Sequence, residues 1–164
     1  MDEASITQYV TDSFEGVNVV VASREAGSPE IAWGDTFFIY DPDRQLPPAG
    51  QFPFATLVTQ DYGDFDCASQ LNRPGIFRLN IGVSKETYRS LFGPQPSPPA
   101  AGGVVETGHD FTALDQLLPH PVYAPQSWVC VLNPSAATFQ SVRPLLAEAY
   151  RLAVGRYTKR EARE

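Results

Sequence analysis

The stretch IFRLNIGV, residues 76–83, is the clearest strand in the sequence, and the other predicted elements are arranged around it. Apolar and polar side chains alternate along it, so an extended chain turns four apolar side chains to one face: Phe77, Leu79, Ile81 and Val83. Arg78 and Asn80 fall on the opposite face. The stretch therefore predicts a sheet with an apolar core on one side and a polar pair on the other.

The remaining elements follow from periodicity and turn residues on either side of this strand. Four further strands are predicted, at residues 17–22, 36–40, 54–59 and 127–132. Helices are predicted at residues 4–14, 84–92 and 112–118, and from about residue 141 towards the C-terminus. Short connections favour hairpins, because a parallel crossover needs a dozen residues or more. We therefore expect an α+β fold, with a twisted antiparallel sheet of about five strands and the N- and C-terminal helices packed on one face.

Length and composition indicate one domain, residues 1–164, with ordinary globular hydrophobicity. The Pro- and Gly-rich stretch QPSPPAAGGVVETG, residues 95–108, predicts a flexible loop. A net charge of −7 disfavours nucleic acid as a partner, because phosphate binding needs a basic surface. The absence of a signal peptide, of a long apolar run and of a CxxC pair favours a cytoplasmic protein with reduced thiols and no membrane segment.

The segment at residues 110–135, DFTALDQLLPHPVYAPQSWVCVLNPS, contains the best candidate for chemistry. His120 lies between Pro119 and Pro121, so its backbone is held extended and its imidazole can be aimed at little entropic cost. Asp115 and Asp110 are near in sequence and could orient the ring, raising its pKa as a general base needs. The structural alternative is that His120 bonds a backbone group and fixes the turn.

Candidate ligand-binding residues lie on the predicted strand and on this segment. Arg78 with Asn80 would form a clamp for a carboxylate or phosphate if a loop covered their face, and would be inert if that face met solvent. Four more candidates could line the same pocket: Trp33, Tyr123, Gln126 and Trp128. For the aromatic residues, packing in the core is the alternative.

No metal or cofactor site is predicted. His109 and His120 are eleven residues apart, with no Cys or His partner at a metal-ligand spacing. The acidic run DYGDFD, residues 61–66, lacks the glutamate that would complete a calcium loop. Neither GxGxxG after a strand nor a P-loop motif occurs.

Three motifs together resemble a family of short actinobacterial proteins catalogued as a domain of unknown function. They are WGDTFFIY at residues 33–40, RPGIFRLNIGV at residues 73–83 and LPHPVYAPQSWVCVLNPS at residues 118–135. More distantly, APQSWVCVL is similar to the turn and strand of the MmcQ/YjbR-like group. That likeness implies a CyaY-like fold, an antiparallel sheet between terminal helices. The group has been suggested to bind DNA, and the family resemblance implies no established activity.

Three functional hypotheses remain open at this point. The first is a domain that binds a small molecule in a pocket between the strand at residues 76–83 and the segment at residues 110–133. The second is an enzyme of accessory metabolism, a cyclase or isomerase, with His120 as base and Asp115 as its orienter. The third is a module that binds a protein partner or forms a homodimer.

Overall fold

An antiparallel sheet with strands of different lengths forms the centre of the protein. The structure is a computed structural model that describes residues 1–101 and 103–163. The strands of the sheet are β1 (Val17–Val21), β2 (Thr36–Tyr40), β3 (Ala55–Val58), β4 (Arg78–Gly82), β5 (Leu117–Pro119) and β6 (Trp128–Leu132). They lie in the order β1-β2-β3-β4-β6-β5, and every neighbouring pair is antiparallel. The expected α+β class and antiparallel sheet are confirmed, with six strands rather than about five.

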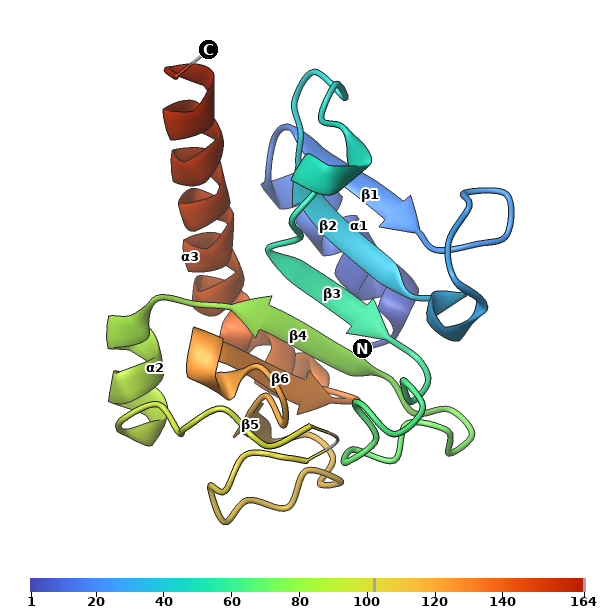
Figure 1. Cartoon of the computed structure of the whole chain (residues 1–164), viewed down its shortest axis with the longest axis vertical. Helices are drawn as coiled ribbons and strands as arrows, with labels where there is room; N and C mark the ends of the chain where they lie inside the picture. The colour runs from blue at the N-terminus through green and yellow to red at the C-terminus, as the bar shows by residue number, and fades with distance from the viewer. Residues whose placement is uncertain (102, 164) are drawn as a thin grey trace.

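Helices α1 (Glu3–Ser13) and α3 (Ala136–Glu161) lie on one face of this sheet, and the shorter α2 (Lys85–Phe92) lies beyond the end of β4 (Figure 1). Each helix begins at a side chain that accepts a hydrogen bond from the first turn: Asp2, Ser84 and Ser135. Such caps typically contribute about 1 kcal/mol each. Three 3₁₀ turns complete the regular structure: η1 (Glu30–Ala32), η2 (Pro48–Gly50) and η3 (Ala124–Gln126).

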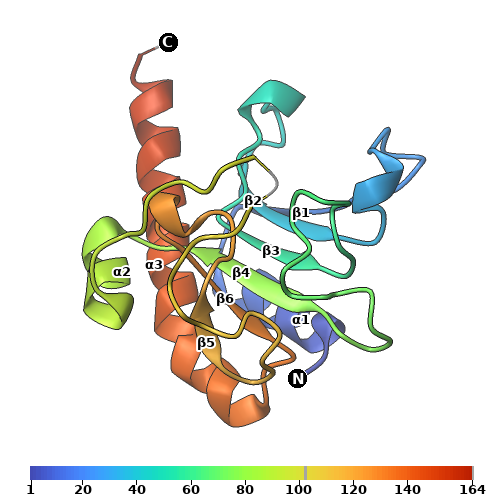
Figure 2. The ribbon, with the colours of Figure 1, turned by 60° about the horizontal axis from the view of Figure 1, so that its bottom comes forward.

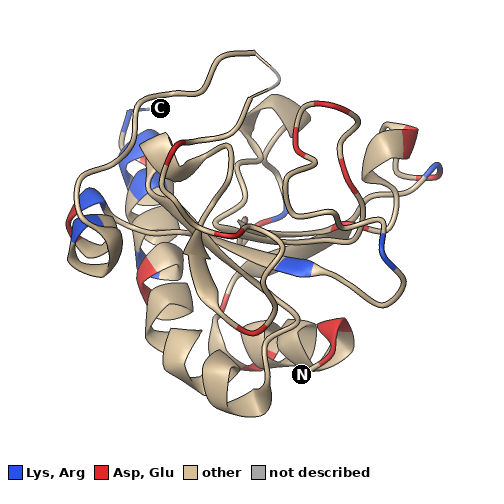
Figure 3. Cartoon of the chain, turned by 90° about the horizontal axis from the view of Figure 1, so that it is seen from below, with Lys and Arg blue, Asp and Glu red and all other residues tan. Residues whose placement is uncertain are grey.

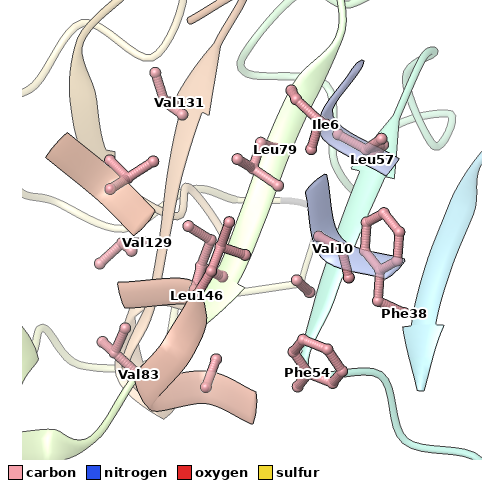
Figure 4. Close-up of a cluster of buried hydrophobic side chains, with 14 of the residues drawn as sticks. Ile6, Val10, Phe38, Phe54, Leu57, Leu79, Val83, Val129, Val131 and Leu146 are labelled. Atoms are coloured by element: carbon pink, nitrogen blue, oxygen red, sulfur yellow. The ribbon is translucent and has the colours of Figure 1, made fainter. Parts of the chain in front are cut away.

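The main core lies between the sheet and the two terminal helices. Ile6 and Val10 of α1 and Leu146 of α3 are fully buried against Phe38 and Leu79 (Figure 4). The strand register aligns Leu79 with Leu57 on β3 and with Val131 on β6, so one apolar row crosses the sheet. The predicted core face of residues 76–83 is confirmed, because all four of its apolar side chains are buried.

Loops, not helices, cover the opposite face of the sheet. The β3–β4 connection and the segment leading into β6 cross in front of it (Figures 2 and 3). Beneath them is a small second core that is buried on this side: Val58, Leu71, Leu118, Cys130 and Leu132. The central strands β3, β4 and β6 are therefore buried on both faces, and Arg78 and Asn80 are buried with them.

Two predicted helices differ from the structure. Residues 112–118 contain no helix; Asp115 adopts a left-handed backbone with φ 58°, and the chain then enters β5, which pairs with β6. The final helix begins at Ala136 rather than near residue 141, because Ser135 caps it, and Pro144 lies inside the helix.

The Pro- and Gly-rich stretch at residues 95–108 is attached at two points among its described residues; residue 102 lies outside them. Gln95 donates a hydrogen bond of 2.7 Å to Ser127 Oγ, and the Val105 N–H donates to the Pro121 carbonyl. Val105 is buried in the main core. The stretch therefore packs at Val105, and its flexibility stays a prediction.

Gly82 provides a test of how closely β4 and β6 approach. A Cβ at this position would lie 3.0 Å from two ring atoms of Trp128, so we expect Gly82→Ala to displace the ring and cost about 1–3 kcal/mol. Gly155→Ala is the matched control, because nothing lies within 4 Å of that Cβ and alanine favours the helix by up to about 1 kcal/mol. Urea unfolding followed by circular dichroism measures both; equal effects of the two substitutions would contradict the close packing.

Candidate functional site

Arg78 is the centre of the most polar cluster inside the protein. The alternation of β4 that buries Leu79 in the main core directs Arg78 to the loop-covered face, where its side chain is 1% exposed. The β3–β4 connection crosses that face and brings Asp66 and Ser69 to the guanidinium. A charged group this deeply buried requires such partners, because an unpaired one would be strongly destabilising.

Four of the five N–H groups of Arg78 have acceptors. Two form a bidentate pair with Asp66, one donates to Ser69 Oγ at 2.9 Å, and Nε–H donates to Asn80 Oδ1 at 2.8 Å. Asn80 in turn donates to Thr56 Oγ1 at 3.0 Å. Burial acts to lower the pKa of Arg78, but the Asp66 carboxylate outweighs it and the pKa is raised. We call these five residues together with His120 the Arg78 centre.

His120 enters the Arg78 centre from the loop between β5 and β6. Its Nδ1 accepts hydrogen bonds from the backbone N–H groups of Val122 at 3.0 Å and Tyr123 at 2.9 Å. A nitrogen that accepts two such bonds carries no proton, so the proton of the neutral ring is on Nε2. Burial, followed by the nearby Arg78 charge, holds the pKa of His120 well below its usual range. The imidazole is therefore neutral and a donor at Nε2.

The Nε2–H of His120 and the fifth N–H of Arg78 converge. His120 Nε2 lies 3.3 Å from Arg78 Nη2, and both nitrogens are donors. The nearest acceptor, Asp66 Oδ2, lies 3.9 Å from Nε2, beyond hydrogen-bonding distance. Among the described residues, these two N–H groups therefore have no acceptor in common, although an oxygen atom beside them could serve both.

Two aromatic side chains cover the outer side of His120. The Tyr123 ring lies 5.0 Å from the imidazole, between centroids, and the Phe65 ring lies 6.1 Å from that of Tyr123. His120 is 2% exposed, whereas Tyr123 is 41% and Phe65 49% exposed. The Arg78 centre is thus separated from solvent by a thin aromatic layer.

A second buried carboxylate lies next to this cluster. Asp35 accepts a hydrogen bond from the Tyr62 hydroxyl and another from the Thr59 backbone N–H at 2.9 Å. Burial raises the pKa of Asp35, and burial together with Asp35 raises that of Tyr62. These bonds fasten the start of the β3–β4 connection to β2, which positions the loop that carries Asp66.

Four predicted site residues come together in the structure: Arg78, Asn80, His120 and Tyr123. The other predicted ligand-binding side chains lie elsewhere. Trp33 donates to the Ser28 carbonyl at 2.9 Å, and Gln126 is exposed in η3. Trp128 lies over Gly82.

The predicted pair of His120 with Asp115 is wrong. Asp115 accepts a hydrogen bond of 2.6 Å from the Ser135 backbone N–H and is exposed beside the start of α3, where these bonds lower its pKa. The pKa of His120 is lowered rather than raised. A neutral imidazole with its proton on Nε2 can donate to a carbonyl or carboxylate, as an electrophile does, but it cannot accept a proton there as a general base.

Sequence reasoning did not identify Asp66, Ser69 or Tyr62 as site residues. The available signal was Arg78 itself, since a cation on a strand buried on both faces needs a carboxylate, and the acidic run at residues 61–66 precedes it closely. The predicted pocket space between β4 and residues 110–133 is occupied by the Arg78 centre and the second core.

Metal-binding groups and membrane-spanning helices are two further features to consider. No three His, Cys, Asp or Glu side chains within residues 1–101 and 103–163 are grouped as a metal ion would require. In the same part of the chain, no helix is both long and apolar enough to cross a membrane.

Fold and site together define a class of protein: an α+β domain with a two-sided antiparallel sheet and a buried arginine–aspartate–histidine centre. The chain belongs to a family of unknown function, DUF6194, whose model matches residues 1–162. Comparison with curated proteins finds no match, and comparison with solved structures finds none either. The expected membership of a family of unknown function is confirmed, and the family assigns no activity.

The neutral state of His120 predicts a specific pH dependence of stability. The unfolded chain binds a proton at His120 near pH 6.5 and the folded chain does not, so the free energy of unfolding falls as the pH drops below about 6.5, by up to about 1.4 kcal/mol per pH unit. In His120→Asn, an amide oxygen replaces Nδ1 as the acceptor and nothing titrates. Urea unfolding across pH 5–8 should show a smaller loss in the variant than in the wild type, and parallel profiles would contradict the neutral assignment.

The Arg78–Asp66 pair predicts a large and local loss of stability. Asp66→Asn keeps the shape of the side chain but leaves the buried guanidinium without its carboxylate, which should cost about 3–5 kcal/mol. Asp64→Asn removes the same charge from an exposed position two residues away and should change stability by less than about 0.5 kcal/mol. Chemical denaturation of both variants measures the difference, and a small effect of Asp66→Asn would mean that the pair is not closed in solution.

Proposed function

We propose that this domain binds a small molecule through a carboxylate or carbonyl oxygen that the Arg78 centre holds. The observation that carries the proposal is the convergence of two buried donors, Arg78 Nη2–H and His120 Nε2–H, without an acceptor between them. Buried polar groups in proteins are nearly always paired, and an unpaired one typically costs about 1–3 kcal/mol. A ligand oxygen that accepts both bonds would recover that free energy on binding.

Access to these donors is through the aromatic layer. Tyr123 and Phe65 are each about half exposed and contact each other at a ring edge, so rotation of their side chains opens a path without unfolding the sheet. The side chains around the two donors already form hydrogen bonds with one another, so only a compact ligand group can reach the donors. Asn80 contributes by fixing the guanidinium through Nε, and Tyr123 contributes the wall next to His120. Trp33, Gln126 and Trp128 have no part in this site.

A nuclear magnetic resonance titration tests the proposal with formate and acetate as probes. In protein labelled with ¹⁵N at histidine and arginine, both acids should shift the His120 Nε2–H and Arg78 side-chain signals saturably. Methylammonium, a small ion without an acceptor, should not. His120→Asn keeps the Nδ1-type acceptor but removes the Nε2–H, so the affinity read from the Arg78 signals should fall by about ten- to a hundredfold.

Phe65→Ala is the matched control for this titration. It thins the aromatic layer without removing a donor, so binding should be retained. If neither acid shifts the His120 signal, or methylammonium shifts it equally, the Arg78 centre is a structural cluster and the proposal fails.

Three predictions made from the sequence concern the location, the distant relatives and the partners of the protein, and they stay predictions. Action in the cytoplasm remains a prediction, as does the distant likeness to the MmcQ/YjbR-like group. Binding of a protein partner, or formation of a homodimer, is a separate hypothesis that the Arg78 centre neither requires nor uses.

A further inference from the structure

A groove lies far from the Arg78 centre, between α3 and the β2–β3 connection. Figure 1 shows that connection, which carries η2, beside the C-terminal half of α3. The contacts between them include a hydrogen bond of 3.4 Å from Tyr157 of α3 to Asp43 and the packing of Arg160 directly on Gly50. The space between them has a volume of about 180 Å³.

The inner part of this groove is apolar and aromatic. Tyr40 and Tyr157 contact each other edge to face, with 5.2 Å between their ring centroids, and Leu46 lies beside them. Phe52 lines the groove from the β2–β3 connection and is 71% exposed. These side chains offer flat surfaces on which an aromatic ring can stack.

The mouth of the groove is basic although the whole chain has a net charge of −7. Arg156 and Arg160 line both the groove and an adjoining hollow of about 380 Å³, which Lys159 and Arg163 complete. These cations gather at the C-terminal end of α3 (Figure 3). Carboxylates also lie near the groove: Asp43 contacts Tyr157, Asp41 accepts from the backbone of the β2–β3 connection, and the charge of Glu161 on α3 acts on Tyr157. Arginine beside an apolar wall suits an anion that carries a ring.

We propose that this groove is a second ligand site, for a small anion that carries a single aromatic ring, an aryl carboxylate or aryl phosphate. The ring lies against Phe52 and Tyr157, and the anionic group lies at the mouth with Arg156. The volume of about 180 Å³ is enough for a single ring, because a cavity of about 150 Å³ accommodates benzene. Arginine side chains recognise both carboxylate and phosphate, so the experiment distinguishes these two sources.

Isothermal titration calorimetry of the whole chain tests this with four probes. Benzoate and phenyl phosphate carry both the ring and the charge, benzylamine carries the ring with the opposite charge, and inorganic phosphate carries the charge alone. At least one of the first two should bind about tenfold more tightly than benzylamine and inorganic phosphate. The tighter of the two anions identifies carboxylate or phosphate as the preferred group.

Matched variants locate the site. Arg156→Gln removes an exposed cation of the mouth and should weaken binding about tenfold, whereas Arg151→Gln removes an equally exposed cation of α3 that does not line the groove and should leave binding unchanged. Phe52→Ser should weaken the ring-bearing probes and leave inorganic phosphate unaffected. Gly50→Ala displaces Arg160 with its new Cβ and should weaken the anions also.

The result that overturns the proposal is equally specific. The proposal fails if none of the probes binds. It also fails if inorganic phosphate binds as tightly as phenyl phosphate and Arg151→Gln lowers the affinity as much as Arg156→Gln does, because the basic end of α3 then attracts anions without a defined site. His120→Asn should not alter these titrations. The calorimetric result for the groove can therefore be told apart from the result for ligand binding at the Arg78 centre.

Discussion

The ion pair between Arg78 and Asp66 determines how the second face of the sheet is covered. The first face packs apolar side chains against α1 and α3 and needs no polar partner. The second face presents a guanidinium at the middle of the sheet, which cannot be left among apolar groups alone. The β3–β4 connection supplies the carboxylate and the β5–β6 loop supplies His120, so two irregular segments are fastened to the sheet by directional polar bonds where another fold would use a helix.

The same surroundings set the chemical character of His120. Its two backbone donors select the tautomer, while burial and the adjacent cation keep the ring neutral. The neutral N–H of His120 and the guanidinium of Arg78 together form a pair of hydrogen-bond donors. In a low-dielectric interior, the electrostatic effect of this pair on a bound oxygen is larger than it would be at the surface. Burial also raises the pKa of the nearby Cys130 thiol to about 12, so the histidine and arginine N–H groups, not a thiolate, are the reactive features of this face.

Much of the fold was predictable from local patterns, and the candidate site was predictable in part. β4 has strict alternation, α1 has apolar side chains at helical spacing, and α2 has the capping residue Ser84, so these elements were identified correctly. β5 was missed because three residues are too few to show an alternating pattern, so this strand is defined only by its pairing with β6. Asp115 illustrates the limit for the site: it is five residues from His120 in sequence, yet its left-handed backbone directs it to α3, while Asp66 arrives from a separate loop.

The position of α1 and α3 in one core has a consequence for how the protein is made. Ile6 and Val10 near the start of the chain share a single apolar cluster with Phe139 and Leu146 near its end, and Tyr9 contacts Phe139 with 5.3 Å between ring centroids. The part of the sheet face that α3 covers therefore stays open until α3 has left the ribosome. During synthesis the apolar side chains of that part of the sheet are exposed, and transiently exposed surface of this kind is prone to aggregation.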